Sequence, residues 1–229
     1  DGGVVCWGEN ASGQTNVPAT LGRASQVAAG GNHSCALKTD GGITCWGSSP
    51  GGLVQGSFSD VSAGRSHTCA FETDGDVVCW GENRSGQTNV PESLGAVAQL
   101  SAGIDHTCVL DSDGGVVCWG ANGAGQINVP GTLNAVRQVS AGNGSHTCVL
   151  QSDGGVVCWG SNGNGQTNVP ATLGSATQVS AGGAHTCAVR SDGGIACWGS
   201  NFSGQSNVPA ALGTATQVSA GGGHTCALR

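Results

Sequence analysis

The sequence predicts an all-β fold, a six-bladed β-propeller of four-stranded antiparallel blades in a single domain that spans residues 1–229. Three observations carry this prediction. A Cys-Trp dipeptide recurs six times, at intervals of 34 to 40 residues. A His-Ser-Cys or His-Thr-Cys step recurs six times at a similar interval. No part of the repeat has the 3.6-residue apolar periodicity of a helix, so each repeat is expected to be one small β unit.

One repeat, residues 138–170, shows the order of the expected strands. Its four short β-prone runs are QVSAG, SHTCVL, GVVCWG and GQTNVP, and turn residues separate them. The SDGG step between the second and third runs predicts a hairpin turn, because Gly readily adopts a positive φ. Pro170 ends the fourth run and cannot donate to a ladder, which favours an outer edge strand. The second repeat departs after Trp46, where it is five residues shorter and lacks GQTNVP.

The positions within the repeat at which the sequence begins and ends predict a closed ring. The chain begins in third-strand sequence, DGGVVCWG, and ends in second-strand sequence, HTCALR. We therefore expect the N- and C-terminal strands to share one blade. Such closure would remove the exposed strand edges that promote aggregation.

Paired cysteines are expected to fasten each hairpin. Two cysteines ten positions apart lie opposite each other across the turn, within reach of a disulfide. The leftover cysteines would become partners on ring closure, and their disulfide should stabilise most, by about 5 kcal/mol against roughly 2–3 for a hairpin. Regular pairing also predicts an extracellular, secreted protein. The predicted pairs are Cys35–Cys45, Cys69–Cys79, Cys108–Cys118, Cys148–Cys158, Cys187–Cys197 and Cys6–Cys226.

Composition excludes several classes of function. The net charge of −7 argues against nucleic acid as a partner, and no apolar stretch is long enough for a membrane span. Zinc is disfavoured because Cys-x-x-Cys spacing is missing and each blade offers two thiols. The stretch Asp111–Gly114 resembles a calcium loop only faintly, because it lacks the third acidic ligand and the distal Glu. We expect no cofactor, no metal and no enzymatic activity.

The successive motifs V-x-A-G-x-x-H-T-C-A-L, D-G-G-V-V-C-W-G and G-Q-T-N-V-P resemble the regulator of chromosome condensation repeat family, and the resemblance covers essentially the whole chain. It is strongest to the bacterial branch that includes the β-lactamase inhibitory proteins. The resemblance implies a propeller, although members usually carry seven blades and generally lack the Cys pairs. The aromatic anchors of the inhibitors have no counterpart here, because the matching positions are Asn32, Ser66, Asp105, Ser145, Ala184 and Gly223.

The repeated His and Trp residues are interpreted as scaffold. Alternation places each His toward a neighbouring blade, where its ring is expected to bond backbone, and the Trp side chains are expected to fill the core between blades. A row of Trp rings that stack on sugars is the alternative.

Function is expected where the blades differ, on the face that carries the loops after Ala-Gly and after Cys-Trp-Gly. We predict a secreted, non-enzymatic module for binding or assembly that recognises a protein partner. The alternatives are a lectin-like carbohydrate binder, for which Phe202 and Phe58 are the free aromatic rings, and, less favoured, a protein inhibitor of an enzyme; self-association is also open. The candidate residues are Glu9, Asn32, Arg65, Ser66, Glu82, Arg84, Ile104, Asp105, Asn143, Ser145 and Phe202. Five N-x-S glycosylation sequons fall on the same face, at Asn10, Asn32, Asn83, Asn143 and Asn201.

Overall fold

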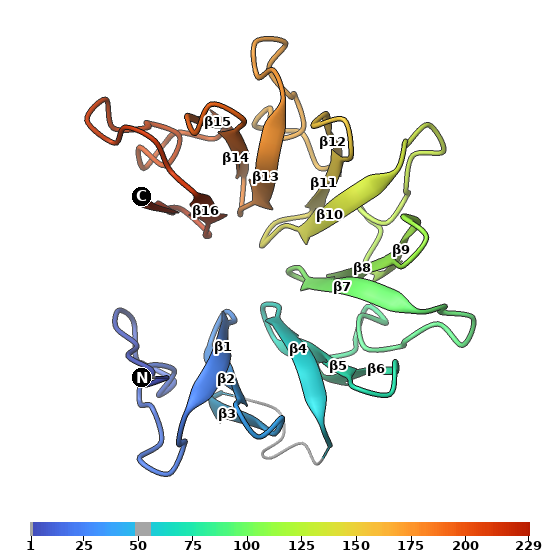
Figure 1. The fold of residues 1–229 in the computed structure, drawn as a ribbon, viewed down its shortest axis with the longest axis vertical. Coiled ribbons are helices and arrows are strands. Elements are labelled where there is room, and N and C mark those ends of the chain that lie inside the picture. The colour runs from blue at the N-terminus through green and yellow to red at the C-terminus, as the bar shows by residue number, and fades with distance from the viewer. Residues whose placement is uncertain (1, 49–55) are drawn as a thin grey trace.

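The computed structural model describes residues 2–48 and 56–229, which form six small antiparallel sheets that follow one another around a centre (Figure 1). Five sheets have three strands and the last has two. The described residues contain no helix, which confirms the all-β prediction, and accordingly no helical segment among them could cross a bilayer. The shortened connection of the second repeat falls on residues 49–55, outside the described residues.

Each complete sheet follows the order of the sequence. The first strands are β1 (Ala24–Ala29), β4 (Phe58–Ala63), β7 (Val97–Ala102), β10 (Val136–Ala141), β13 (Ala176–Ala181) and β16 (Gln217–Ala220). The second strands are β2 (His33–Lys38), β5 (His67–Glu72), β8 (His106–Asp111), β11 (His146–Gln151), β14 (His185–Arg190) and β17 (Thr225–Leu228). The third strands are β3 (Ile43–Gly47), β6 (Val77–Gly81), β9 (Val116–Gly120), β12 (Val156–Gly160) and β15 (Ile195–Gly199).

The predicted hairpins and five of the predicted disulfides are confirmed. In the turn between β8 and β9, Gly114 has a φ of 86°, a conformation that favours glycine. The register of this hairpin puts Cys108 directly opposite Cys118, with their Cα atoms 4.1 Å apart and their sulfurs bonded. The other bonded pairs are Cys35–Cys45, Cys69–Cys79, Cys148–Cys158 and Cys187–Cys197.

The prediction of a fourth strand in each blade is wrong. The GQTNVP segments form turns and extended chain without a ladder to the third strand. Their backbone groups bond to side chains of the same segment instead. In the connection between β6 and β7, Ser85 N donates to Gln87 Oε1 at 2.9 Å, and Thr88 N donates to Asn83 Oδ1 at 3.0 Å. Local side-chain acceptors have thus replaced the partner that a strand would provide.

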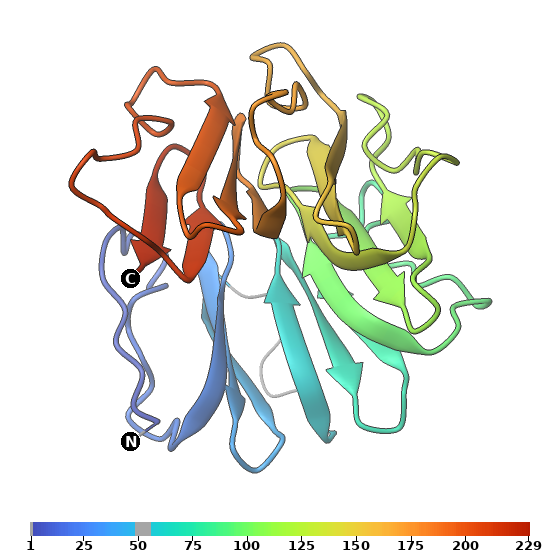
Figure 2. The ribbon, with the colours of Figure 1, turned by 45° about the horizontal axis from the view of Figure 1, so that its top comes forward.

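The prediction that the terminal strands share one blade is also wrong. Residues 2–7 form no strand, β16 and β17 pair only with each other, and Cys6 and Cys226 are free thiols. The N-terminal segment lies on the first sheet, where Gly2 O accepts a hydrogen bond from Ala24 N at 2.9 Å and Val4 packs near Trp46. The two ends therefore border an opening in the ring of sheets (Figures 1 and 2).

The hydrophobic core is divided into clusters between neighbouring sheets. One cluster joins Cys108 and Leu110 of β8 to Val139 of β10 and Trp159 of β12. Five of the six clusters are built from two neighbouring sheets, and the sixth joins the N-terminal segment to the first sheet. Neighbouring sheets therefore stabilise one another in sequence around the centre.

Candidate binding face

The loops between first and second strands converge near the centre of the molecule, where backbone hydrogen bonds connect them. Gly31 N donates to Gly64 O at 3.3 Å, Ile104 N to Gly142 O at 3.1 Å, and Gly183 N to Gly221 O at 2.9 Å. These bonds fix the positions of loops whose sequences differ between repeats.

Glycine is required for this close approach. A Cβ added to Gly103 would lie 2.5 Å from His106 Cε1 and 2.7 Å from the carbonyl oxygen of Gly142 in the next sheet. Real Cβ atoms do not approach their neighbours so closely, and the second contact is with backbone. The Ala-Gly step therefore allows adjacent loops to pack directly against each other.

A buried row of His-Thr contacts runs behind these loops. His106 Nε2 lies 2.9 Å from Thr147 Oγ1, and His67 Nε2 lies 3.0 Å from Thr107 Oγ1. Contacts of the same kind join His33 to Thr68, His146 to Thr186 and His185 to Thr225. The expectation that each ring bonds backbone is wrong, because the partner is the threonine hydroxyl of the next repeat.

Burial keeps these rings neutral. Desolvation, with a smaller effect of neighbouring histidines, lowers the pKa of His67 to about 4, that of His106 to about 3 and that of His146 to about 4. The His-Thr row occupies the interior between sheets, so it acts as scaffold.

Five of the Trp side chains pack into the hydrophobic core, as predicted: four are buried, and the half-buried Trp80 packs against the cluster between the first two sheets. Trp119 is 7% exposed, and its Nε1 donates to Gln87 O at 2.9 Å. The same carbonyl accepts from Thr107 Oγ1 at 2.9 Å. Equivalent indole bonds occur at Trp46, Trp159 and Trp198. Trp7 departs from the pattern and is 85% exposed.

The converging loops enclose a cavity of about 570 Å³, which we call the loop-face cavity. Its lining includes Glu9, Arg65, Ile104 and Asn143, four of the predicted site residues, which come from different repeats. The remaining lining is mostly glycine backbone of the same loops, together with the end of β16 and the β16–β17 loop, residues 219–224. The structure thus brings an acid, a base, an aliphatic group and an amide to one hollow.

A second, shallower hollow of about 490 Å³ lies over the loop that follows β6. It is lined by the predicted residues Ser66, Glu82 and Arg84, together with Ser48 and Asn83. Arg84 Nε lies 3.3 Å from Glu82 Oε1, in an ion pair whose arginine is 90% exposed. Solvent screening leaves such a pair little effect on stability.

The other predicted residues lie outside the linings of both hollows. Asn32 and Phe202 are exposed, Phe202 by 94%, whereas Asp105 and Ser145 are half-buried. The interpretation of Phe58 as a free ring is wrong, because Phe58 is 3% exposed and lies in the core between the first two sheets.

Three of the sequon asparagines have a structural role. Asn83 Nδ2 donates to Asn89 Oδ1 at 2.7 Å, while its Oδ1 accepts from Thr88 N. Asn10 and Asn201 make the same pair of bonds in their own loops. Because Asn122 and Asn162 repeat the arrangement without a sequon, the asparagine at this position is explained by the loop itself.

Acidic groups occur mainly in the hairpin turns on the opposite face. Asp111 Oδ1 accepts bonds from Asp113 N at 2.9 Å and Gly115 N at 2.7 Å, so the segment that resembled a calcium loop is a side-chain-capped turn. The sequence reading missed a neighbouring group in the β5–β6 turn, where oxygens of Glu72, Asp74 and Asp76 lie within 4.8 Å of one another. Exposed acidic groups of this kind commonly occur without a metal.

These features define a class of protein: a β repeat protein whose scaffold residues recur and whose loop-face cavity also carries side chains that differ between repeats. The model of the regulator of chromosome condensation (RCC1) repeat matches residues 24–52, 58–87, 97–126, 136–166 and 176–205. These matches cover more than half of the chain, which therefore belongs to the RCC1 repeat family. A search of the curated proteins found no match.

Solved structures of similar fold include proteins from plants and yeast. The CRINKLY WD40 ectodomain of the receptor kinase ACR4 from Arabidopsis thaliana is 26% identical, with a TM-score of 0.79 over 98% of this chain and 83% of that one. The entire ectodomain of the receptor kinase CR4 from Physcomitrella patens is 27% identical, with a TM-score of 0.74 over 91% of this chain and 61% of that one. Prp20p from Saccharomyces cerevisiae is 18% identical, with a TM-score of 0.77 over 90% of this chain and 68% of that one.

Proposed function

We propose that this chain is an extracellular, non-enzymatic binding module, a six-bladed propeller that recognises a protein partner through the loop-face cavity and the loops around it. The observation that carries the proposal is the convergence of Glu9, Arg65, Ile104 and Asn143 on one hollow. Repeated residues hold the loops in place, whereas Arg65, Ile104 and Asn143 differ from their equivalents in the other repeats, and Glu9 recurs only as Glu82. A concave site with a few polar groups of different kinds suits selective recognition.

Three further observations support this proposal. Five disulfides within hairpins fit an oxidising compartment. Two of the similar structures are receptor ectodomains, which are extracellular by description. The net charge of −7 disfavours the phosphate backbone of nucleic acid as a ligand.

The experiment compares matched variants of the labelled protein. We expect a partner captured from the native extracellular fluid to bind the parent chain and Asp113→Ala, whose substitution lies in the β8–β9 turn on the opposite face. Arg65→Ala and Ile104→Ala should each weaken capture at least about tenfold, as expected where a buried anchor is truncated. Capture that is equal for all four proteins would overturn the assignment of the face.

Carbohydrate is the second candidate, because two aromatic rings, those of Trp7 and Phe202, are 85% and 94% exposed. Aromatic faces suit stacking on sugars. A glycan array separates the candidates: saturable binding to one sugar class that Phe202→Ala abolishes would favour the lectin, and binding to none would favour the protein partner.

A further inference from the structure

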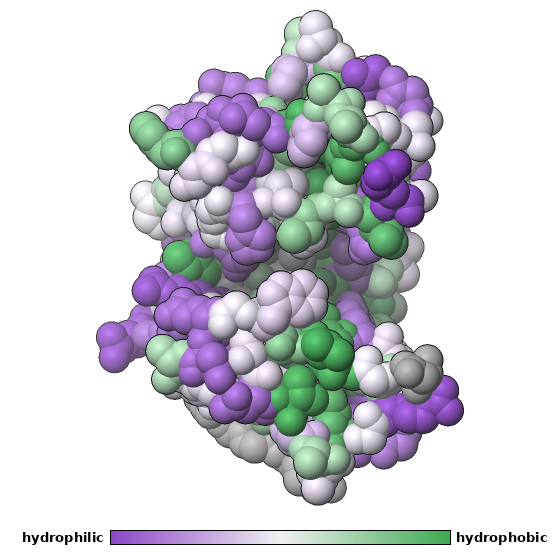
Figure 3. All heavy atoms as spheres, turned by 90° about the vertical axis from the view of Figure 1, so that its left-hand side faces the viewer, coloured by the Kyte–Doolittle hydropathy of each residue, from purple (hydrophilic) through white to green (hydrophobic). Residues whose placement is uncertain are grey.

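The turn between β5 and β6 borders a groove of about 290 Å³, which we call the turn-face groove. The rest of its lining comes from the start of β6 and from residues between 90 and 95, in the connection to β7. These elements lie across the ring from the opening between the two ends, where other hydrophobic residues are exposed (Figures 1 and 3). The volume is at the lower end of the range of ligand pockets, so the groove suits a few side chains of a ligand.

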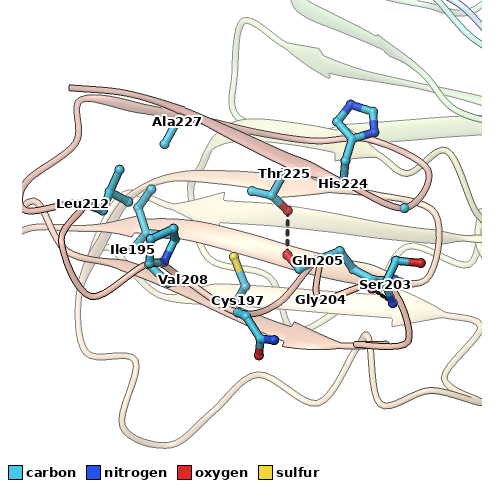
Figure 4. A pocket seen from close by; sticks show the side chains of 13 residues that line it. Ile195, Cys197, Ser203, Gly204, Gln205, Val208, Leu212, His224, Thr225 and Ala227 are labelled. Atoms are coloured by element: carbon cyan, nitrogen blue, oxygen red, sulfur yellow. Dashed lines mark hydrogen bonds between the residues drawn. The ribbon is translucent and has the colours of Figure 1, made fainter. Parts of the chain in front are cut away.

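One part of the lining is apolar and belongs to the repeat. Val77, Val90 and Leu94 line the groove and pack against the core between the second and third sheets. Leu94 is half-buried, so part of this apolar surface remains open to a ligand. Figure 4 shows the equivalent side chains of a later repeat gathered in the same way: Ile195, Val208 and Leu212.

The other part of the lining is acidic, and its acids depart from the repeat. Glu72 and Asp76 contribute carboxylates from the β5–β6 turn, and Glu92 contributes one from the connection to β7. The other turns have Gly at the position of Asp76, and the other connections that carry this segment have Ala or Gly at the position of Glu92. Asp74 adds a fourth carboxylate, since oxygens of Glu72, Asp74 and Asp76 lie within 4.8 Å of one another.

Two other turns carry a built-in cation that this turn lacks. In the β2–β3 turn Lys38 Nζ lies 2.9 Å from Asp40 Oδ2, and in the β14–β15 turn Arg190 pairs with Asp192. Glu72 occupies the position of Lys38 and Arg190, so an acid stands where those turns have a base. No carboxylate of the groove forms an ion pair within the part of the chain that the structure describes, and every Lys, Arg and His of the sequence lies in that part.

We propose that the turn-face groove binds a basic segment of a partner protein, in which an arginine or lysine lies beside an aliphatic residue. The charged head takes the place that Lys38 and Arg190 occupy in their own turns. The aliphatic stem of the basic side chain and the neighbouring residue cover the apolar lining. A calcium ion is less favoured as the ligand, because it binds oxygen atoms only and would leave the apolar lining uncovered.

This site goes beyond the proposed function, because it lies on the other face and shares no residue with the loop-face cavity. A single exposed ion pair contributes little to binding. The affinity must therefore come from several carboxylates that act on one cation, together with the burial of apolar surface. Salt should accordingly weaken the complex, since it screens the exposed charges and leaves the apolar contact in place.

The experiment measures the binding of a fluorescein-labelled peptide, Gly-Leu-Arg-Leu-Arg-Gly, to the intact protein by fluorescence anisotropy. The control peptide carries citrulline, which has nearly the shape of arginine without its charge, at both arginine positions. We expect saturable binding of the arginine peptide and at least about tenfold weaker binding of the citrulline peptide. Equal binding of the two peptides would refute the proposal.

Matched variants place the peptide in the groove. Asp76→Gly combined with Glu92→Ala introduces the residues of the other repeats, so the fold should be kept, and affinity should fall at least about tenfold. Asp113→Ala combined with Asp153→Ala removes the same number of charges from two other turns and should leave affinity unchanged. Glu72→Lys supplies the missing cation within the chain and should abolish binding.

Three outcomes would overturn the assignment. Equal weakening by the two double variants would mean that the peptide responds only to the net charge of the protein. Parent-like binding by Asp76→Gly combined with Glu92→Ala, or by Glu72→Lys, would place the peptide elsewhere. Calcium chloride that binds the parent but not the groove variants, with no binding of the arginine peptide, would assign the carboxylates to a metal.

Discussion

Acidification should unfold this protein well above the pH at which carboxylates titrate, because its buried histidines must remain neutral in the folded state. The pKa of His67 and of His146 is lowered to about 4, and that of His106 to about 3. In the unfolded chain all three should titrate near the ordinary value of about 6.5. Between these limits the unfolded state binds more protons, so the free energy of unfolding must fall as the pH falls.

The magnitude follows from the number of protons. Each proton bound by the unfolded chain alone costs about 1.4 kcal/mol of stability per pH unit, so three histidines give a slope of about 4 kcal/mol per unit between roughly pH 6 and 4.5. The stabilisation is complete above pH 6.5 and is lost progressively toward pH 4. From pH 7 to pH 5 the loss is about 6 kcal/mol, comparable to the whole stability of many domains.

The assay is denaturant unfolding followed by far-ultraviolet circular dichroism at half-unit steps from pH 7 to pH 5. His106→Gln should reduce the slope of stability against pH by about a third, whatever its effect on stability at pH 7. Asp113→Ala, an exposed residue in a hairpin turn, is the control and should keep the parent slope. A slope below about 1 kcal/mol per unit, or one that His106→Gln leaves unchanged, would refute the burial argument.

Three further predictions test the scaffold by the same unfolding measurement. Gly103→Ala should destabilise by about 1–3 kcal/mol because its Cβ would meet the carbonyl of Gly142, whereas Gly123→Ala, with nothing within 4 Å, should be neutral; equal effects would contradict the packing of the loops. Trp119→Ala should cost about 3–5 kcal/mol and Trp119→Phe much less, since Thr107 still bonds the Gln87 carbonyl; similar losses would argue against an apolar role for the ring. Replacing Cys108 and Cys118 together by Ala should cost roughly 2–3 kcal/mol, and no loss would mean that the hairpin is already ordered in the unfolded state.

The sequence was sufficient to predict the features that one repeat encodes. Two cysteines ten positions apart in one hairpin can be paired from the sequence, because the Asp-Gly turn between them sets the register of the two strands. The alternation of residues along the second strand correctly placed the histidine toward the next sheet. The shared face of the two loop sets followed from the order of strands, and Glu9, Arg65, Ile104 and Asn143 do line one cavity.

The failures concern relations that no single repeat encodes. Whether residues 2–7 meet β17 depends on how all six sheets pack around the centre, and β17 pairs only with β16. The partner of His106 is Thr147, 41 positions away, and was not recognisable until the packing of neighbouring sheets was known. The fourth strand does not form because the side chains of Gln87 and Asn83 accept hydrogen bonds from backbone N–H groups of this segment. In a strand, such backbone groups would pair with the neighbouring strand instead.

Residues that recur in every repeat hold the sheets together, whereas residues that differ between repeats contribute side chains to the loop-face cavity. A substitution at Gly103, His106 or Trp119 disturbs contacts between two sheets at once. The loss of folding stability therefore includes contacts of the neighbouring sheet as well. A substitution at Arg65 or Ile104 changes the lining of the cavity, while the bonds that hold their loops come from backbone groups. Under the proposed function, the free energy of folding and the choice of partner would therefore be set by separate residues, so the loop face could vary without loss of the scaffold.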